Sequence, residues 1–452
     1  YSCPSYLTNT IVAFNGGYGT YVTGWDGEKQ YLDYSLVYGN VSGAHTNDSD
    51  TPVLGPNMLA SDPKLGSDFR LTSSSPCIDA GKDLSSAGIT NDLDGIARTN
   101  TFDIGCYESA FPPPPKYNFA YADASAVDDN GDGTNWLTAK KTIGAGLSIL
   151  TPTGTCYVAS GVYGEGVSIA ANITIAGTNR STTVISNSGS VVSMGATNAT
   201  LREVTAVGGT RGVSLSGIGN LVQGCILRTN TESGAYITST SNRLEDCEIR
   251  GNQYGVYAPG WGGIYTLDRC TIVSNTSHGV YQSGGNPSSP GGLLRNCLIV
   301  RNGGDGFSTW TDNGPLSTYL YNCTIAFNTG NGIYDNYLTR TPYVYNCIIY
   351  GNTGRGILQN NNGHYAFYVA NSCLSSNTTG NIYHYQANGQ ITLQGSNVSA
   401  EPLFAGAGDY HLQSGSPCID TGTNLTSSGV TTDRDGNART APFDMGCYQS
   451  AY

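Results

Sequence analysis

The feature that most constrains the fold of this chain is a short phrase that recurs along its second half. It reads DRCTIVSNTSHGVY at residues 268–281 and returns with small changes, for example as YNCTIAFNTGNGIY and YNCIIYGNTGRGIL. A period of 21 to 27 residues, typical of solenoid proteins, separates its anchors, which are Val204, Cys225, Cys247, Cys270, Cys297, Cys323, Cys347 and Cys373. The anchor and the apolar residue two places later share one face of a strand. Each repeat therefore predicts a short strand, and no helical stripe accompanies it.

Strands that recur at this spacing without helices between them bury their inner faces only by stacking turn upon turn. We therefore predict an all-β, right-handed parallel β-helix. Five residues after the anchors comes an asparagine, suited to a turn with left-handed backbone, and a ladder of stacked amides is expected at Asn230, Asn252, Asn275, Asn302, Asn328 and Asn352. A glycine three or four residues later marks a second bend.

Composition limits the function classes. The chain has 452 residues, of which 61 are glycines and only 12% are charged, as suits a turn-rich β solenoid. A net charge of −12 argues against nucleic acid or an anionic membrane as partner, and no apolar run approaches the length of a membrane span, so direct membrane insertion is not expected. The chain starts at Tyr1 without a basic and apolar leader, so we expect a processed protein or a fragment of a longer one.

The last residues of the chain are a copy of an earlier stretch. SPCIDAG and FDIGCYES around residues 77–106 return 341 residues later as SPCIDTG and FDMGCYQS. Residues 1–110 are therefore interpreted as the last coils and tail of a first β-helix module. A Pro-rich linker at 111–116 follows. A complete module at 117–401 with an N-terminal cap and a tail at 402–452 completes the chain.

Two parts of the chain resemble known families. The tails that contain DLDGIART and DRDGNART resemble the choice-of-anchor Q domain of bacterial surface and secreted β-helix proteins. The segment YADASAVDDNGDGTNWLTAKKTIGAGLSIL resembles the start of pectate-lyase-like β-helices. Together these resemblances cover nearly the whole chain. They imply architecture more than activity, because the same scaffold carries lyases, hydrolases, adhesins and spikes.

Four cysteines stand outside the repeat in two pairs, each 29 residues apart in matching contexts. We interpret them as disulfides that join Cys77 to Cys106 and Cys418 to Cys447, each worth about 3–4 kcal/mol for a loop of that length. Such bonds indicate an oxidising compartment. Buried free thiols are the alternative, because a free cysteine packs well as a small apolar residue.

DDNGDG at residues 128–133 matches the first half of a calcium loop, with candidate ligands at Asp128, Asn130 and Asp132. The position of the bidentate glutamate is Ala139, so an ordinary Asx-rich turn is the alternative. No other cofactor is expected. Glu245 and Asp268 hold the same place in consecutive coils, as a catalytic or calcium site or as part of a charged surface. No residue is assigned as catalytic.

Tyrosines follow the second bend in several coils, and stacking aligns them as a stripe for assembly or glycan binding at Tyr236, Tyr257, Tyr281, Tyr334 and Tyr383. The stripe faces either outward or into the core, and alternation along the strand favours the outward direction.

The main functional hypothesis is a secreted or cell-surface structural protein, extracellular in location, whose tandem modules form a rod or a head-to-tail fibre with adhesive use. Self-association follows from the uncapped first coil, whose strand edges invite pairing. A polysaccharide lyase or hydrolase of the pectate-lyase-like class is the first alternative. A glycan-binding module without catalysis is the second. A polysaccharide is thus a further candidate partner.

Overall fold

The computed structural model describes residues 5–22, 29–47, 52–55, 57–59, 61–99, 101–113, 115–259, 264–284, 291–310, 317–336, 342–360, 366–384 and 390–451. The chain folds as two compact units. Unit 1 comprises Tyr1–Ala122 and Ala126–Gly154, and unit 2 comprises Asp123–Ser125 and Thr155–Tyr452. The predicted bounds of the modules, linker and cap remain predictions. No helix in the described part of the chain is long and apolar enough to cross a membrane.

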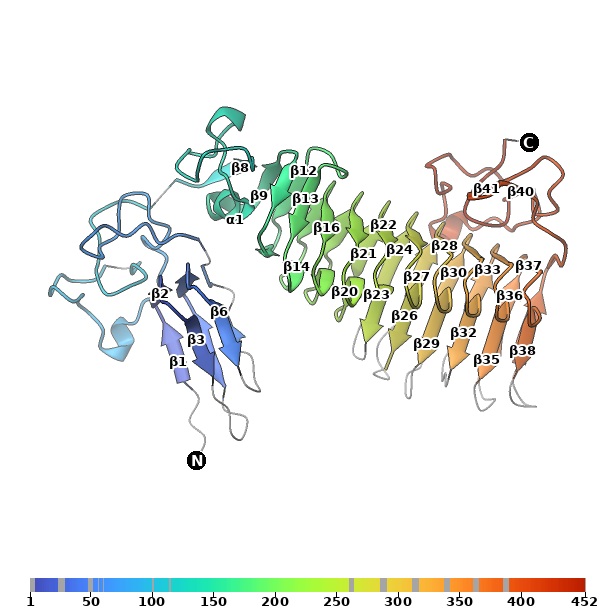
Figure 1. Ribbon diagram of the computed structural model, residues 1–452, viewed down its shortest axis with the longest axis horizontal. Coiled ribbons are helices and arrows are strands. Elements are labelled where there is room, and N and C mark those ends of the chain that lie inside the picture. Colours follow the sequence, from blue (N-terminus) through green and yellow to red (C-terminus); the bar gives the residue numbers. More distant parts are fainter. Residues whose placement is uncertain are drawn as a thin grey trace. The chain divides into compact units, whose positions relative to one another are not determined.

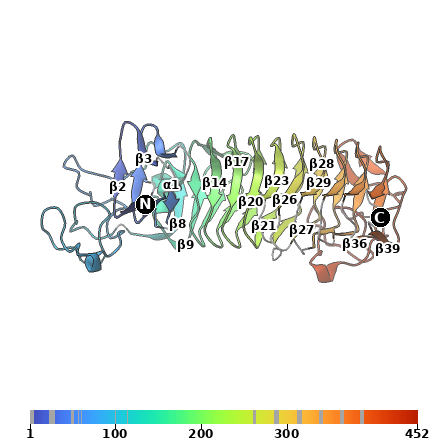
Figure 2. The same cartoon turned by 90° about the horizontal axis from the view of Figure 1, so that it is seen from below.

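Unit 2 is a parallel β-helix in which each turn contributes one strand to each of three sheets, A, B and C (Figures 1 and 2). In stacking order, sheet A contains β9 (Leu150–Val158), β12 (Thr174–Gly177), β15 (Thr200–Arg202), β18 (Leu221–Gln223), β21 (Asn242–Glu245), β24 (Tyr265–Asp268), β27 (Gly292–Arg295), β30 (Tyr319–Tyr321), β33 (Tyr343–Tyr345), β36 (Ala366–Ala370) and β39 (Gln390–Gln394). The predicted all-β parallel solenoid is confirmed.

In the described part of the chain, sheets B and C each have ten strands, and neighbouring strands pair in parallel. Sheet B contains β10 (Gly161–Tyr163), β13 (Thr183–Ser186), β16 (Thr205–Val207), β19 (Ile226–Arg228), β22 (Glu248–Arg250), β25 (Thr271–Val273), β28 (Leu298–Val300), β31 (Thr324–Ala326), β34 (Ile348–Tyr350) and β37 (Cys373–Ser375). Sheet C contains β11 (Val167–Ser168), β14 (Ser190–Met194), β17 (Arg211–Leu215), β20 (Ser233–Ile237), β23 (Tyr254–Pro259), β26 (Val280–Ser283), β29 (Phe307–Trp310), β32 (Ile333–Asn336), β35 (Ile357–Asn360) and β38 (Ile382–His384).

Unit 1 repeats the same strand pattern on a smaller scale. Its parallel sheets are β1 (Ser5–Thr8), β4 (Gln30–Asp33) and β7 (Val53–Leu54), then β2 (Ile11–Ala13) and β5 (Leu36–Tyr38), and β3 (Tyr18–Val22) and β6 (Gly43–Asn47). Unit 1 also holds β8 (Tyr117–Ala122) and the short helix α1 (Ile143–Ser148), whose first turn is capped by the Thr142 hydroxyl. Short 3₁₀ turns of the chain lie at Ser85–Ala87, Trp136–Thr138 and Thr426–Ser428.

Alternation along the short strands separates a buried interior from an outer face. In sheet B the middle residue of a strand points into the solenoid and is fully buried, as at Ile249, Ile272, Ile299, Ile325 and Ile349. The residues on either side of it point outward. Equivalent aliphatic side chains therefore stack along the axis, and this apolar burial is the main force that holds the turns together.

An asparagine ladder forms the bend between sheets B and C. The side-chain oxygen of each rung after the first accepts hydrogen bonds of 2.9–3.1 Å from the backbone N–H and the amide group of the rung one turn earlier. The rungs are Asn230, Asn252, Asn275, Asn302, Asn328, Asn352 and Asn377. The sequence predicts left-handed backbone at the asparagines, but it falls on the preceding residue, for example Thr229, Ser274 and Phe327 with φ of 55° to 56°.

The tail of unit 2, residues 401–451, packs on the outside of its own solenoid, where Figure 1 shows it in red beside the last turns. It contains an antiparallel pair, β40 (Phe404–Gly406) and β41 (Asp409–Leu412). Asn346 clamps the tail: its Nδ2 donates to the Thr423 carbonyl at 2.7 Å, and its Oδ1 accepts from the Thr423 N–H at 2.8 Å. In unit 1, Asn9 makes the same two bonds with Lys82 in that unit's tail, residues 62–110.

Candidate functional site

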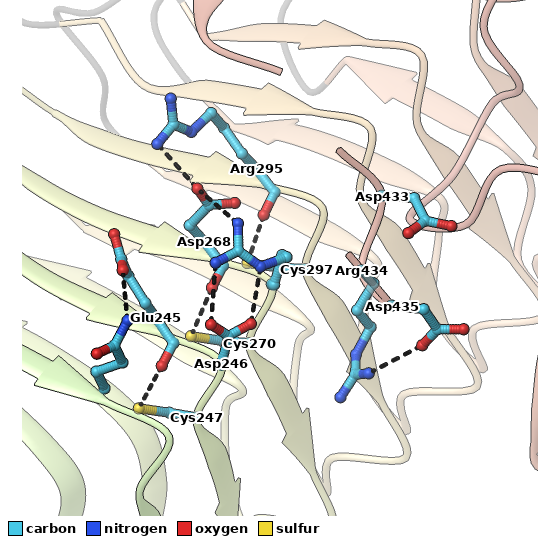
Figure 3. Close-up of polar contacts among 12 residues, drawn as sticks. Glu245, Asp246, Cys247, Asp268, Cys270, Arg295, Cys297, Asp433, Arg434 and Asp435 are labelled. Atoms are coloured by element: carbon cyan, nitrogen blue, oxygen red, sulfur yellow. Dashed lines mark hydrogen bonds and ion pairs between the residues drawn. The ribbon is translucent and has the colours of Figure 1, made fainter. Parts of the chain in front are cut away.

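A cluster of charged side chains lies on the outer face of sheet A in the middle of the unit 2 solenoid (Figure 3). Glu245 ends β21, Asp268 ends β24 and Arg295 ends β27, and these strands are neighbours in the sheet. The register pairs Glu245 with Asp268 and Asp268 with Arg295. Residues at one register position point to the same face of a parallel sheet. With the flanking residues, the charge cluster consists of Arg243, Glu245, Asp246, Asp268, Arg269 and Arg295.

Every carboxylate of the charge cluster is engaged by an arginine. Arg269 holds Asp246 through two hydrogen bonds, from Nε at 2.7 Å and from Nη2 at 2.9 Å. Arg295 donates from Nη2 to Asp268 at 3.0 Å, and Nη1 of Arg269 lies 3.6 Å from the same carboxylate. Glu245 pairs with Arg243, two residues earlier on the same strand.

Burial differs sharply within the charge cluster. The side chains of Asp268 and Glu245 are 8% and 11% exposed, whereas that of Arg243 is 50% exposed. The hydrogen bond to Asp246 raises the pKa of Arg269 above its ordinary value, so this guanidinium stays charged. The arginines hold the three carboxylates in fixed positions. The arrangement is therefore a fixed pattern of charges, with Arg243 as the group most open to a ligand.

The tail borders the charge cluster on one side. Nη1 of Arg295 donates to the carbonyl of Gly429 at 3.2 Å, and Arg434 contacts the Thr271 hydroxyl. Figure 3 shows Arg434 beside Asp435, with their charged groups 3.8 Å apart. These contacts join the tail to strands far away in sequence, so sequence reasoning had no signal for them.

A row of tyrosines that the sequence analysis missed continues the outer face of sheet A. Tyr319, Tyr343 and Tyr368 are paired in register on β30, β33 and β36. Their rings stack, with centroids 5.0 Å and 5.3 Å apart and planes within 13° of parallel. The same register position holds Arg243 three strands before Tyr319. A signal was present in the sequence, because YLYNC and YVYNC place tyrosines at fixed distances before two anchors.

The predicted tyrosine stripe lies on the outer face of sheet C, at Tyr236, Tyr257, Tyr281, Tyr334 and Tyr383. The first three are adjacent in the sheet, but Ser308 and Leu358 interrupt the rest. Tyr257 and Tyr281 stack at 5.4 Å. The guanidinium of Arg211 lies 3.3 Å above the Tyr236 ring, and that of Arg355 lies 4.1 Å above the Tyr383 ring. This stripe is therefore interrupted and covered at both ends by arginines.

The calcium loop predicted in residues 128–133 closes on itself. The carboxylate of Asp128 accepts from the backbone N–H and the amide of Asn130, at 2.8 Å and 2.7 Å. Asp132 accepts from the N–H and hydroxyl of Thr134, at 3.0 Å and 2.9 Å. These are the contacts of an Asx turn, the alternative interpretation. Among the residues that the structure describes, no group of three or more His, Cys, Asp or Glu side chains is placed to hold a metal ion.

The two predicted disulfides are not formed in the structure, where all twelve described cysteines are free. Cys77 is buried whereas Cys106 is exposed, so the two thiols lie in different environments. Cys418 and Cys447 are both buried, but in separate apolar clusters. The matched spacing of these pairs reflects the duplication of the tail, not bonding between the two sulfurs.

Two apolar cavities lie away from the charge cluster. One of about 540 Å³ lies in unit 1, and Ile11, Phe14, Phe69 and Tyr107 are among its lining residues. Another of about 570 Å³ lies in unit 2, lined by residues that include Arg301, Phe327, Tyr350 and Phe404. Neither is lined by a residue of the charge cluster, which belongs to a strand face rather than to either cavity.

Comparison with known proteins agrees with this architecture. A family model described as right handed beta helix region matches residues 153–289 and 262–429. No curated protein matches the chain. Among solved structures, a pectate lyase is similar at 15% identity, with 74% of this chain and 96% of that chain covered and a TM-score of 0.51. At this identity the likeness shows the fold alone.

Two other solved structures match more weakly. A pectin methylesterase from Aspergillus niger is 16% identical, with 55% of this chain and 87% of that chain covered and a TM-score of 0.38. An alginate lyase from Paenibacillus is 12% identical, with 62% of this chain and 99% of that chain covered and a TM-score of 0.36. Both TM-scores are too low to support an argument about this chain.

Proposed function

The chain belongs to the family of right-handed β-helix proteins, and we propose that it binds an extended, uncharged polysaccharide along the outer face of sheet A without cleaving it. The observation that carries the proposal is the row of stacked tyrosines Tyr319, Tyr343 and Tyr368 on one column of outer side chains. Towards Arg243 the column continues through Leu293 and Thr266, and its Leu293 and Tyr319 side chains also pack against the tail. Each strand adds one residue to this column, at the strand spacing of about 4.8 Å. Such a repetitive surface suits a linear polymer that lies along the solenoid axis.

The stacking of the tyrosines determines how they would meet a sugar. Neighbouring rings cover each other's faces, which leaves ring edges and hydroxyl groups rather than ring faces for contact with a sugar. Phenolic hydroxyls both donate and accept hydrogen bonds, as sugar hydroxyls do. The stacked rings therefore carry a row of hydroxyl groups that can form hydrogen bonds with a sugar chain.

Charge favours a neutral polymer over a polyanion. The charge cluster contains three arginines and three carboxylates, which cancel, and the whole chain carries −12. A chain with this net negative charge repels an anionic ligand at long range. Binding without cleavage follows from the ion pairs, because Glu245, Asp246 and Asp268 are all engaged by arginines.

The experiment is affinity electrophoresis and calorimetry with neutral glucans and xylans, with pectate as the anionic comparison. Changing Tyr319, Tyr343 and Tyr368 together to Phe keeps the ring stack and removes only the hydroxyls. We expect this variant to bind at least about tenfold more weakly, a loss of about 1.4 kcal/mol or more. The matched control changes Tyr236, Tyr257 and Tyr281 on sheet C to Phe, and it should bind like the wild type.

A second pair of variants tests whether Arg243 contributes to binding, with an arginine on sheet B as the control. Arg243 pairs with Glu245 two residues away on sheet A, and Arg250 pairs with Glu248 two residues away on sheet B. R243Q should weaken binding and R250Q should not. Equal affinity of the wild type, R243Q and the sheet A variant would remove the proposal. New reducing ends or unsaturated products would show that the protein cleaves the polysaccharide rather than only binding it.

A rod or fibre is the second candidate, favoured by the repeated parallel stacking of strands in each unit. A strand edge that is left unpaired offers backbone hydrogen-bonding groups to a second copy. Electron microscopy of the purified protein tests this candidate: filaments support it, and single particles at high concentration exclude it.

We also propose that both tails are choice-of-anchor Q domains and that the protein works outside the cell or on its surface. The support is the shared motif and the clamp that both tails make, from Asn9 and from Asn346. Digestion of the protein by a protease added to intact cells tests this location. Complete protection until the cells are lysed would exclude it.

A further inference from the structure

Cys373 lies one residue out of step with the other cysteines of the repeat. Cys347, one turn earlier, shows the regular position: it directly precedes β34, is fully buried and points into the solenoid. In the last turn Ser372 takes this inward position, and its hydroxyl accepts a hydrogen bond from the Cys347 N–H at 3.0 Å. Cys373 is instead paired in register with Ile348. Because a shift of one residue moves a side chain to the opposite face of a strand, Cys373 points outward, toward the tail.

The tail brings a second thiol against Cys373. Cys373 and Cys418 belong to one buried cluster with Leu412 and Met445, and both cysteines are 0% exposed. The two thiols interact within this cluster, and each shifts the pKa of the other. The two sulfur atoms are therefore neighbours within an otherwise apolar contact. Cys447, which the sequence analysis pairs with Cys418, lies in a different cluster.

Unit 1 contains the same tail without the partner thiol. Cys77 stands at the place of Cys418 and is equally buried. Its neighbour from the solenoid is Leu36, which occupies in β5 the position that Cys373 occupies in β37. The chain thus carries an internal control, in which the tail cysteine packs on leucine in one unit and on cysteine in the other.

We propose that Cys373 and Cys418 form a disulfide bond that fastens the tail to the last turn of the solenoid. The oxidant is a low-molecular-weight disulfide such as oxidised glutathione. One cysteine thiolate attacks a glutathione sulfur and releases one reduced glutathione, and the second cysteine then attacks the mixed disulfide and releases the other. The two cysteines lose two protons and two electrons in total, and one glutathione disulfide becomes two thiols.

The thiolate is the nucleophile in disulfide exchange, and the thiolate of either cysteine can make the first attack. Both sulfurs are covered when the tail is docked, so the reaction proceeds before docking during folding or through local opening of the tail. The bond then closes the loop between residues 373 and 418 and opposes further opening.

The test incubates the full-length protein with oxidised glutathione and maps its cysteines by mass spectrometry without reduction. We expect one peptide pair joined through Cys373 and Cys418. The thiol count in denaturant should fall by two per chain on oxidation. Cys77 should form no cross-link. A bond between Cys418 and Cys447, or no cross-link at all, would overturn the proposal.

Two variants separate the bond from the packing. C373L installs the residue that unit 1 uses at this position, so the tail should still dock, but oxidation should no longer protect it from protease. C347S places a serine in the interior row, as Ser372 does naturally, and should keep both the cross-link and the protection. Oxidative protection of the tail that persists in C373L would show that another group is responsible and would refute the assignment.

Discussion

At the scale of single residues, the two tails build one geometry from different titrating groups. The ring of His411 lies between two carboxylates, 2.6 Å from Asp409 and 2.9 Å from Asp435. Unit 1 has Arg70 at this position, where it pairs with Asp94. An arginine stays charged throughout the physiological range, but a histidine does not. The tail of unit 2 therefore responds to pH at a position where the tail of unit 1 does not.

The first prediction follows from the sign of this shift. Burial lowers the pKa of His411, but the hydrogen bonds to Asp409 and Asp435 outweigh it and raise the pKa above its ordinary value. The contact therefore stabilises the tail fully below the unfolded pKa of about 6.5, and the contribution is lost as pH rises through the folded pKa. H411R should match the wild type near pH 5–6 and be more stable near pH 8. The gain should stay below about 1 kcal/mol, because the His411 side chain is 46% exposed.

Thermal unfolding of both proteins across this pH range provides the measurement. Other groups titrate alike in the wild type and in H411R, so only the difference between the two curves reports on His411. Parallel curves would show that the histidine contributes nothing. A larger difference at low pH would show that the sign is wrong.

At the scale of elements, the repeat predicted the strands and the ladder but not the reason for every residue in them. The glycine after the ladder is expected to form a bend, yet Gly255 lies inside β23. A Cβ at Gly279 would lie 2.6 Å from Ile299 Cγ2 and 2.9 Å from the Asn302 amide. Glycine is needed there to leave room for the ladder of the next turn. One repeat read alone does not reveal a contact with the next.

The ladder itself gives the second prediction. Asn302 is fully buried, and its oxygen accepts both the N–H and the amide of Asn275, at 3.0 Å and 2.9 Å. N302A leaves these two buried donors without an acceptor, which costs about 1–3 kcal/mol for each group. We expect a loss of about 2–4 kcal/mol in the free energy of unfolding. Urea denaturation followed by circular dichroism measures it.

The first rung is the matched control for this prediction. Asn230 accepts one hydrogen bond from the preceding turn, from the Gly209 N–H at 3.1 Å. N230A therefore leaves fewer buried donors without an acceptor than N302A, and it should lower the free energy of unfolding by less. Similar losses in the two variants would mean that the ladder bonds do not determine the effect.

At the scale of the whole chain, the tail turns an outer side of the unit 2 solenoid into core. Val430 and Phe443 pack on Tyr321 in one buried cluster, and Tyr410 packs on Leu298 in another. Such contacts join distant segments, as the bond from Arg295 to Gly429 does across 134 residues. The duplication shows that a tail exists and where it begins. The face on which it docks is set by side chains of several turns, and no local pattern in the sequence encodes it.

The third prediction compares the two tails at one position. Val430 and Ile89 are equivalent residues 341 positions apart, but Val430 is fully buried whereas Ile89 is 45% exposed. V430D places an unpaired charge in an apolar cluster, at a cost of several kcal/mol, or roughly 3–5. The unit 2 tail should then leave the solenoid. Limited proteolysis should find new cleavage sites within residues 401–451, and light scattering should detect self-association through the uncovered apolar strip around Leu298.

I89D adds the same charge at an exposed position and should leave both the cleavage pattern and the mass unchanged. If V430D resists protease like the wild type, or if I89D is damaged to the same extent, burial by the docked tail does not distinguish these two positions.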